Sequence, residues 1–424
     1  MERRVDTWSR PFVKAGWIRT VLVMTVLVMT VPLLADDWTQ FRGTDRDGTS
    51  AEKGLHAWTS ETGPREVWRR PIGSGYSGIT AVEGRLFTMD SDGEKEYAVA
   101  LDAATGSEAW RVPVGGLFRN DFGDGPRSTP TYDDGKVYTV ASLGHLNAHR
   151  ASDGKILWTV SFKERFGSEL PQWAFSSAPL VFGELLIVEV GGKDGPAVAA
   201  FNKATGDVVW TAHEGELAYS SPIAIDFGGV RQIVVMTKGE VFALDGAGKT
   251  LWRTEFVPEL GIKPAPPVFV APDLLFVSAS YDAGAKAFRL SQKDGKIVAE
   301  DAWETRFMRN HFNGSVALDG HLIGFDKATL KCLDAATGEM TWAKRGLGKG
   351  SLIRTDDLLI ILGERGQLVL AEADTAAYTE LASHPVLSGR TWTQPTLAGG
   401  HLYLRDQDEI VSLDLTAGAG GGDA

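Results

Sequence analysis

The side chains best suited to binding a ligand stand just ahead of a series of similar steps that lead into short apolar runs. Those steps are Thr129-Pro130, Ala178-Pro179, Ser221-Pro222, Pro266-Pro267 and Gln394-Pro395. Within about four residues before each step or its quasi-equivalent position stand basic or aromatic residues: Tyr76, Arg127, Phe175, Tyr219, Lys263, His311, Phe312, Lys349 and Trp392. Such a group could bind a carboxylate, a phosphate or the acidic tail of another protein, with the rings as stacking surface. The alternative is that these side chains fill the space where they meet, pair with local Asp or Glu and hold ordered water.

The elements that must position these residues are short paired strands. Eight apolar runs begin at Arg85, Lys136, Leu185, Gln232, Leu274, His321, Leu358 and His401. Each is followed by a partner run, and these begin at Tyr97, Leu146, Ala197, Val241, Lys286, Leu330, Leu368 and Ile410. The runs are rich in Val, Ile and Leu and bounded by Gly or Asp, which is typical of antiparallel strands joined by tight turns.

A turn followed by Trp marks the end of each repeat. In Asp102-Ala-Ala-Thr-Gly106 the Trp stands four residues past the Gly, at Trp110, and the other copies keep this spacing. The motif residues are Trp68, Gly106, Trp110, Gly154, Trp158, Gly206, Trp210, Gly248, Trp252, Gly338 and Trp342. With Gly295 of the fifth repeat included, successive glycines lie 42 to 52 residues apart, the length of a four-stranded propeller blade. We interpret the Trp residues as structural, because neighbouring blades must cover each other's apolar faces.

Three repeats depart from this pattern. The fifth has Ala299 where Trp is expected, with Trp303 nearby, and the seventh, around Glu372 and Asp374, has neither Gly nor Trp. The eighth lacks an outer strand, and 66–72 has the composition to supply it from the N-terminal side. The sequence therefore predicts an all-β, eight-bladed β-propeller at 66–415, with four-stranded antiparallel blades and the ring closed by the N-terminal strand. The long loops at 115–127, 161–175 and 303–314 are the expected rim that touches a partner.

The AxDxxTGxxxW turn, the eight blades and this mode of closure resemble the pyrroloquinoline-quinone (PQQ) repeat propellers. That group includes quinoprotein alcohol dehydrogenases and the BamB-type lipoproteins of the outer-membrane β-barrel assembly machinery. The opening WTQFRG at 38–43 is also similar to the start of many bacterial envelope proteins with this propeller. The resemblance implies either a binding scaffold or a dehydrogenase.

The dehydrogenase alternative requires a set of cofactor ligands and a catalytic base, and this chain does not match that set. The resemblance implies that those enzymes hold PQQ with adjacent half-cystines, a calcium ion with acidic and amide ligands, and an Asp base, whereas the chain has one cysteine, Cys332. We therefore predict no catalytic residue and no cofactor, although a basic mouth would suit PQQ, which is a tricarboxylate. Asp45-Arg-Asp47-Gly48 lacks the third oxygen ligand and the distal Glu of a calcium loop, so we interpret it as a polar turn and predict no metal site.

The first 35 residues indicate export. Five basic residues precede an apolar core of about 15 residues that ends at Ala35, as in a secretory signal peptide. The alternative is an uncleaved anchor, although the core is short for a stable membrane span. No cysteine follows the signal to accept a lipid. Residues 36–65 are then an N-terminal extension and 416–424 a flexible Gly-rich tail.

The net charge of −12 disfavours nucleic acid and anionic membrane surfaces as partners. These observations together predict a secreted or periplasmic, monomeric, non-catalytic propeller that acts as a binding or assembly scaffold in the cell envelope, BamB-like but without the lipid anchor. Its partner is then an envelope protein or a small anionic ligand. The alternative is a PQQ-dependent dehydrogenase-like enzyme, or a protein that binds a small anion at the channel mouth.

Overall fold

The computed structural model describes residues 1–2, 37–258, 261–281 and 283–416, without the side chains of 192–194. The chain divides into two compact units, Met1–Leu34 and Ala35–Ala424, and only the second is described below. The predicted signal peptide and Gly-rich tail lie outside the described residues, apart from Met1, Glu2 and Thr416. Among the described residues, no helix is both long and apolar enough to cross a bilayer.

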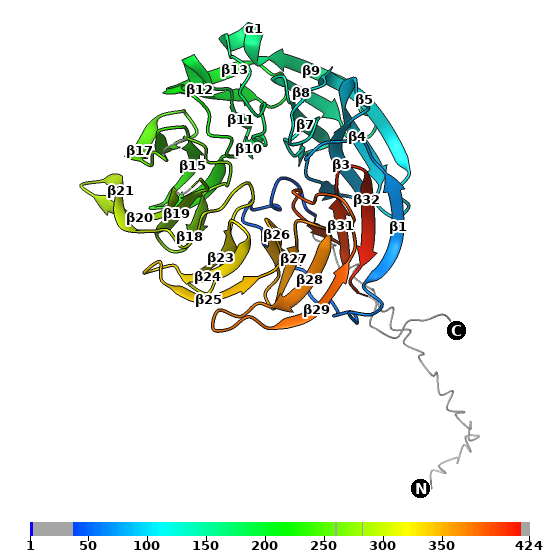
Figure 1. Cartoon of the computed structure of the whole chain (residues 1–424). Coiled ribbons are helices and arrows are strands. Elements are labelled where there is room, and N and C mark those ends of the chain that lie inside the picture. The colour runs from blue at the N-terminus through cyan, green and yellow to red at the C-terminus, as the bar shows by residue number, and fades with distance from the viewer. Residues whose placement is uncertain (3–36, 259–260, 282, 417–424) are drawn as a thin grey trace. The chain divides into compact units, whose positions relative to one another are not determined.

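In the described part of the second unit the strands form eight four-stranded antiparallel sheets, arranged around a centre (Figure 1). From the innermost strand outward, blade 1 contains β2 (Thr80–Val82), β3 (Arg85–Ser91), β4 (Lys95–Asp102) and β5 (Glu108–Gly116). Blade 2 contains β6 (Thr131–Asp133), β7 (Lys136–Ala141), β8 (His145–Arg150) and β9 (Ile156–Ser161). Blade 3 contains β10 (Leu180–Phe182), β11 (Leu185–Glu189), β12 (Gly192–Asn202) and β13 (Val208–Gly215). Blade 4 contains β14 (Ile223–Phe227), β15 (Val230–Met236), β16 (Glu240–Leu244) and β17 (Thr250–Glu255).

The second half of the chain repeats this plan. Blade 5 contains β18 (Val268–Val270), β19 (Leu274–Ala279), β20 (Gly284–Lys293) and β21 (Lys296–Thr305). Blade 6 contains β22 (Val316–Leu318), β23 (His321–Asp326), β24 (Thr329–Asp334) and β25 (Met340–Arg345). Blade 7 contains β26 (Ser351–Arg354), β27 (Leu358–Leu362), β28 (Gln367–Glu372) and β29 (Glu380–Pro385). Blade 8 contains β30 (Thr396–Ala398), β31 (His401–Arg405), β32 (Glu409–Asp414) and, as its outer strand, β1 (Arg65–Pro71). One short helix, α1 (Phe162–Phe166), precedes blade 3 in the described residues.

The N-terminal strand closes the ring, which confirms the predicted architecture. β1 pairs antiparallel with β32, from Arg65 opposite Asp414 to Pro71 opposite Glu409. Arg405 of β31 is fully buried and fastens this joint, because its guanidinium donates to the carbonyls of Gly73 and Gly75, between β1 and β2, and to the carbonyl of Met89 in β3. Blades 8 and 1 are therefore joined by buried hydrogen bonds as well as by apolar packing.

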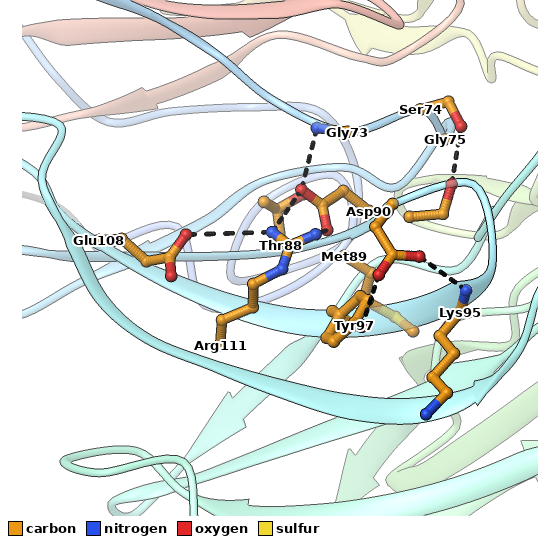
Figure 2. Close-up of polar contacts among 12 residues, drawn as sticks. Gly73, Ser74, Gly75, Thr88, Met89, Asp90, Lys95, Tyr97, Glu108 and Arg111 are labelled. Atoms are coloured by element: carbon orange, nitrogen blue, oxygen red, sulfur yellow. Dashed lines mark hydrogen bonds and ion pairs between the residues drawn. The ribbon is translucent and has the colours of Figure 1, made fainter.

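A second polar contact holds the chain where it passes from blade 8 into blade 1. The buried carboxylate of Asp90 accepts hydrogen bonds from the backbone N–H of Gly73 at 3.0 Å and from Nη1 of Arg111 at 2.9 Å (Figure 2). Ser74 and Ser91 join their hydroxyls at 2.7 Å beside it. An ion pair that is also hydrogen-bonded to backbone can be buried at low cost, so this contact fixes the connection between the first and last blades.

Most of the motif Trp residues join one blade to the next. Nε1 of Trp68 donates to the carbonyl of Ala103, and that of Trp110 to the carbonyl of Ala151, each in the turn of the following blade. In the fifth repeat Trp303 takes this role, because its Nε1 donates to the carbonyl of Ala335 at 2.8 Å. Trp252 differs, since its partner is Gln232 of its own blade. An outer Trp therefore covers the turn of its neighbour in most repeats, including one where the spacing differs by four residues.

Replacing Gly106 with Ala should lower the free energy of unfolding by about 2 kcal/mol more than the same change at Gly84. Both glycines have a left-handed φ, +70° and +74°, so both variants carry the same backbone strain of roughly 1 kcal/mol. A Cβ at Gly106 would lie 2.6 Å from the ring of Trp68, whereas none of the surrounding atoms lies within 4 Å of a Cβ at Gly84. Urea denaturation of the two variants measures the difference, and equal losses would contradict the role given to the Trp contact.

Candidate functional site

A cavity of about 560 Å³ lies where the innermost strands of all eight blades begin. We call this end of the propeller the mouth, and the segments that lead into the innermost strands the leading loops. The described lining residues, in chain order, are Phe41, Tyr76, Gly78, Phe122, Arg127, Thr129, Trp173, Ser176, Ala178, Tyr219, Ser221, Ile262, Pro264, Tyr281, His311, Phe312, Asn313, Lys349, Trp392, Thr393 and Gln394. Because every blade contributes to it, we refer to it as the axial cavity.

Seven of the nine predicted residues line the axial cavity: Tyr76, Arg127, Tyr219, His311, Phe312, Lys349 and Trp392. Phe175 is instead buried between blades 2 and 3, with its ring edge-on to Phe162 at 5.2 Å between centroids. Lys263 is also fully buried, and its Nζ donates to the carbonyl of Thr237 at 2.7 Å. The spacing rule selected the right loops, but it could not say which side of a leading loop faces the centre.

Lys263 is therefore not the firm cation that its position in the sequence suggests. Burial lowers the pKa of Lys263 to about 7, and the nearby carboxyl of Glu189 only partly opposes this effect. Burial also raises the pKa of Glu189 well above its ordinary value. Lys263 lies in the leading loop of blade 5 and Glu189 ends β11 of blade 3; both are buried, and neither lines the axial cavity.

Five rings form a continuous chain along one side of the axial cavity, and we call this chain the aromatic arc. Tyr76 stacks on Trp392 at 5.3 Å between centroids, and Trp392 lies 4.8 Å from Phe312. His311 continues the arc 4.7 Å from Phe312, and Tyr281 lies 5.3 Å beyond His311. The arc runs from blade 1 through blades 8 and 6 to blade 5. Tyr76 and Trp392 come from opposite ends of the propeller sequence, so ring closure brings these two rings together.

Two cationic side chains line the axial cavity, and none of its described lining residues is acidic. The guanidinium of Arg127 lies 5.4 Å from the centroid of Tyr76 and donates to the carbonyl of Gly123 at 2.9 Å. Its burial lowers the pKa of Arg127, against the smaller opposing effects of Tyr76, Glu96 and Asp124. Burial, with the nearby charge of Lys349, lowers the pKa of His311 to about 4, so His311 is neutral at physiological pH. The positive charge of the cavity therefore comes from Arg127 and Lys349.

The sequence reasoning missed several ring-bearing residues of the site. Phe122 and Trp173 lie in the two long loops that were predicted to form the rim, so loop length was a usable signal for them. Tyr281 lies in the turn between β19 and β20, and Phe41 lies in the N-terminal extension. Neither position precedes an innermost strand, so the rule that was applied to the leading loops could not find them.

The N-terminal extension forms part of the site, because residues 37–50 lie at the centre of the ring (Figure 1). We call this segment the N-terminal plug. Trp38 bridges to Ala81 of β2, the carbonyl of Thr39 accepts from the backbone of Tyr132 in β6, and Thr49 bridges to Arg354 of β26. Phe41 of this segment lines the axial cavity.

Two fully buried arginines fasten the plug to the blades. Arg42 donates to the carbonyls of Gly314 and Ser315, ahead of β22. Arg46 donates to the carbonyls of Ala178 and Pro179, ahead of β10, and to that of Pro222, ahead of β14, at 2.8 Å. Burial lowers the pKa of Arg42 to about 10 and that of Arg46 to about 9. Both guanidinium groups keep their charge at neutral pH and satisfy carbonyls that would otherwise be left buried at the centre of the ring.

The residues described here do not match the ligand set by which the resemblance implies that PQQ is held. Cys332 is buried in β24, so no adjacent half-cystines can form at the mouth. Nowhere in the described ranges do three or more His, Cys, Asp or Glu side chains gather as a metal site. Asp45 and Asp47 lie in turns of the N-terminal plug, and Asp47 accepts from the backbone of Thr49.

Comparison with known proteins agrees with the architecture. Residues 94–344 and 283–420 match the family described as outer membrane protein assembly factor BamB. The BamB of Burkholderia pseudomallei (strain K96243) is 25% identical over 366 residues, which cover 79% of this chain and 86% of the relative. That of Moranella endobia (strain PCIT) is 28% identical over 192 residues, which cover 42% of this chain and only 44% of the relative.

Solved structures show the same fold. BamB from Moraxella catarrhalis superposes with a TM-score of 0.59 at 15% identity, over 82% of this chain and 97% of that one. A quinohemoprotein alcohol dehydrogenase from Pseudomonas putida HK5 superposes with a TM-score of 0.51 at 11% identity, over 90% of this chain and 80% of that one. At these sequence identities the solved structures support a shared fold and nothing about function. The family match spans most of the propeller, and the chain therefore belongs to the family of the outer membrane protein assembly factor BamB.

Proposed function

We propose that this protein is a non-catalytic binding scaffold of the cell envelope, which holds a protein partner against the mouth of the propeller. Membership of the BamB family supports an assembly-factor role. That family and the apolar, basic start of the sequence support a secreted or periplasmic location. We expect the protein to act as a monomer.

The observation that carries this proposal is a set of exposed apolar side chains around the mouth. Phe122, Leu170, Val257, Tyr281 and Phe307 are 41% to 67% exposed, and all five lie in loops at the mouth end of their blades. Large apolar side chains at a rim are typical of protein-binding surfaces, because their burial in a complex supplies most of the binding free energy. The remaining large apolar side chains exposed by residues 37–416, apart from the masked positions, lie on the outer strands.

The dehydrogenase alternative is less well supported. The fold is shared with quinohemoprotein alcohol dehydrogenases, but the described lining of the axial cavity lacks the acidic residues that a calcium ion and a catalytic base require. A binding role needs no such residues. Binding of a small anion in the cavity is compatible with the scaffold, because Leu170, Val257 and Phe307 of the rim are not among the residues that line the cavity.

Site-specific crosslinking tests the proposal. A photocrosslinking residue at position 170, in the leading loop of blade 3, should yield one dominant adduct with an envelope protein, and excess unmodified protein should suppress it. The same residue at position 209 is the matched control, because Val209 is 54% exposed on the outer strand β13. Equal crosslinking at both positions, or adducts that excess protein does not suppress, would contradict docking at the mouth.

A further inference from the structure

The axial cavity contains more hydrogen-bonding side chains than a pocket for a flat, apolar ligand would require. Besides its rings, its wall contains six neutral side chains that can donate and accept: Thr129, Ser176, Ser221, Asn313, Thr393 and Gln394. Thr129, Ser221, Asn313 and Gln394 each make a hydrogen bond within the protein. A hydrocarbon chain would leave their remaining donors and acceptors without partners, at a cost of roughly 1–3 kcal/mol for each buried group. The cavity therefore suits a ligand that presents both apolar faces and many hydroxyl groups.

Some of this hydrogen-bonding capacity is not used by the protein itself. Nε of Arg127, Nδ1 of His311 and Oε1 of Gln394 are buried and have no hydrogen-bond partner among the described residues. Gln394 keeps a fixed position, because its Nε2 donates to the carbonyl of Leu352 at 3.0 Å. Most buried polar atoms in folded proteins are paired, so three unpaired atoms among the lining residues indicate groups that a ligand can satisfy after small side-chain rotations.

The aromatic arc supplies the apolar part of the site. The indole of Trp392 is held in place, since its Nε1 donates to Glu364 at 3.1 Å and the guanidinium of Arg390 lies 4.6 Å from the centroid of its ring. A fixed indole offers a flat platform against which the C–H face of a pyranose ring can pack, in the same way as aromatic side chains pack on other apolar groups. The neutral hydroxyl and amide groups can then reach the hydroxyls at the edge of the sugar.

The charge of the lining residues narrows the class of ligand further. Arg127 and Lys349 line the axial cavity, while the nearby carboxylates of Glu364, Glu96 and Asp124 lie behind its wall. Glu364 is engaged by the backbone N–H of Lys349 and by Trp392, which leaves the Lys349 side chain to face a ligand. In a chain with a net charge of −12, two lining cations without a lining anion select a negatively charged group. A carboxylate also suits the planar guanidinium of Arg127.

The size of the cavity also fits this chemistry. A volume of about 560 Å³ lies within the range of roughly 300–1,000 Å³ typical of small-molecule sites. Phe41 of the N-terminal plug contributes to the lining. We propose that the axial cavity binds an acidic saccharide of one or two pyranose rings, with its ring against the aromatic arc and its carboxylate at Arg127 and Lys349. This site goes beyond the docking of a protein at the rim.

Calorimetric titration with digalacturonate tests the assignment. We expect binding with a dissociation constant below about 1 mM, while lactose, a neutral disaccharide, should bind at least about tenfold more weakly. Lys349→Gln should weaken the binding of digalacturonate about tenfold, because it removes a charge from the cavity wall. Lys249→Gln is the matched control, since Lys249 is exposed in the turn before β17, and it should leave the affinity unchanged.

Trp392→Ala should weaken binding at least about tenfold, and Trp392→Phe should restore part of the affinity, because Phe keeps an apolar ring. Melting temperatures of all variants show whether the fold is intact, and a variant that melts early is replaced by Tyr76→Leu in the same arc. The assignment is overturned by any of three results: no heat at about 10 mM digalacturonate, equal affinity for lactose, or binding of 2-naphthoate but not of the uronate. None of these results bears on crosslinking at position 170, so the two proposals fail separately.

Discussion

Replacing Arg405 with Ala should lower the free energy of unfolding by about 4 kcal/mol, the largest stability effect that we expect from a single substitution in this protein. The guanidinium of Arg405 is fully buried and bonds to blade 1 through Thr88 and Met89. It also bonds to the chain between β1 and β2 through Gly73 and Gly75. The variant removes every one of these donors at once, and it leaves both a cavity and buried carbonyls without partners.

Urea denaturation, followed by tryptophan fluorescence, measures this effect. Arg365→Ala is the matched control, because Arg365 is exposed in the turn between β27 and β28, and it should change the free energy of unfolding by less than about 0.5 kcal/mol. A loss below about 1 kcal/mol for Arg405→Ala would mean that apolar packing of blade 8 on blade 1 closes the ring without this residue.

Replacing Arg46 with Met should cost about 3 kcal/mol and should loosen the N-terminal plug before the blades themselves unfold. Met fills much of the volume of Arg but donates no hydrogen bond, so the carbonyls of Ala178 and Pro222 lose their buried partner and that of Pro179 keeps only the hydroxyl of Thr131. Hydrogen exchange should accelerate at the amides of Trp38 and Ser50, which bond to Ala81 and Arg354. Exchange in the central strands of the blades should change much less.

The exposed Arg165 in α1 provides the matched control, since Arg165→Met changes the same chemistry outside the channel. Faster exchange at the plug in both variants, or unchanged exchange at Trp38 in Arg46→Met, would contradict the role of Arg46 as a fastener. Slower exchange in the variant would contradict it more strongly.

The fold could be predicted almost completely from the sequence, because the propeller repeats one rule about eight times. Each copy of the turn and its Trp indicates the same packing between neighbouring blades. An irregular copy can therefore be interpreted by comparison with the regular ones. Trp303 shows this: its spacing is wrong, but the structure places it over the turn at Ala335 as the repeat requires. The closing strand was found because blade 8 lacked an outer strand and a segment of suitable composition preceded blade 1.

The site was predictable only where it follows the repeat. Seven of the nine residues taken from the leading loops do line the axial cavity, but Lys263 and Phe175 point into the blades, and spacing carries no information about that choice. The N-terminal plug is not part of the repeat, so the repeat pattern could not identify it. Arg42 and Arg46 look like surface residues in a polar stretch, and only the three-dimensional arrangement of carbonyls from blades 3, 4 and 6 explains their burial.

Blade 8 combines strands from both ends of the propeller, and this has a consequence for biogenesis. Arg65 pairs with Asp414, which lies 349 positions later. A chain that emerges gradually, N-terminus first, must therefore wait with β1 unpaired until nearly all the other blades have appeared. During that delay an open edge is available to foreign strands. We expect nascent or exported intermediates of this protein to depend on holding chaperones far more than the finished ring does.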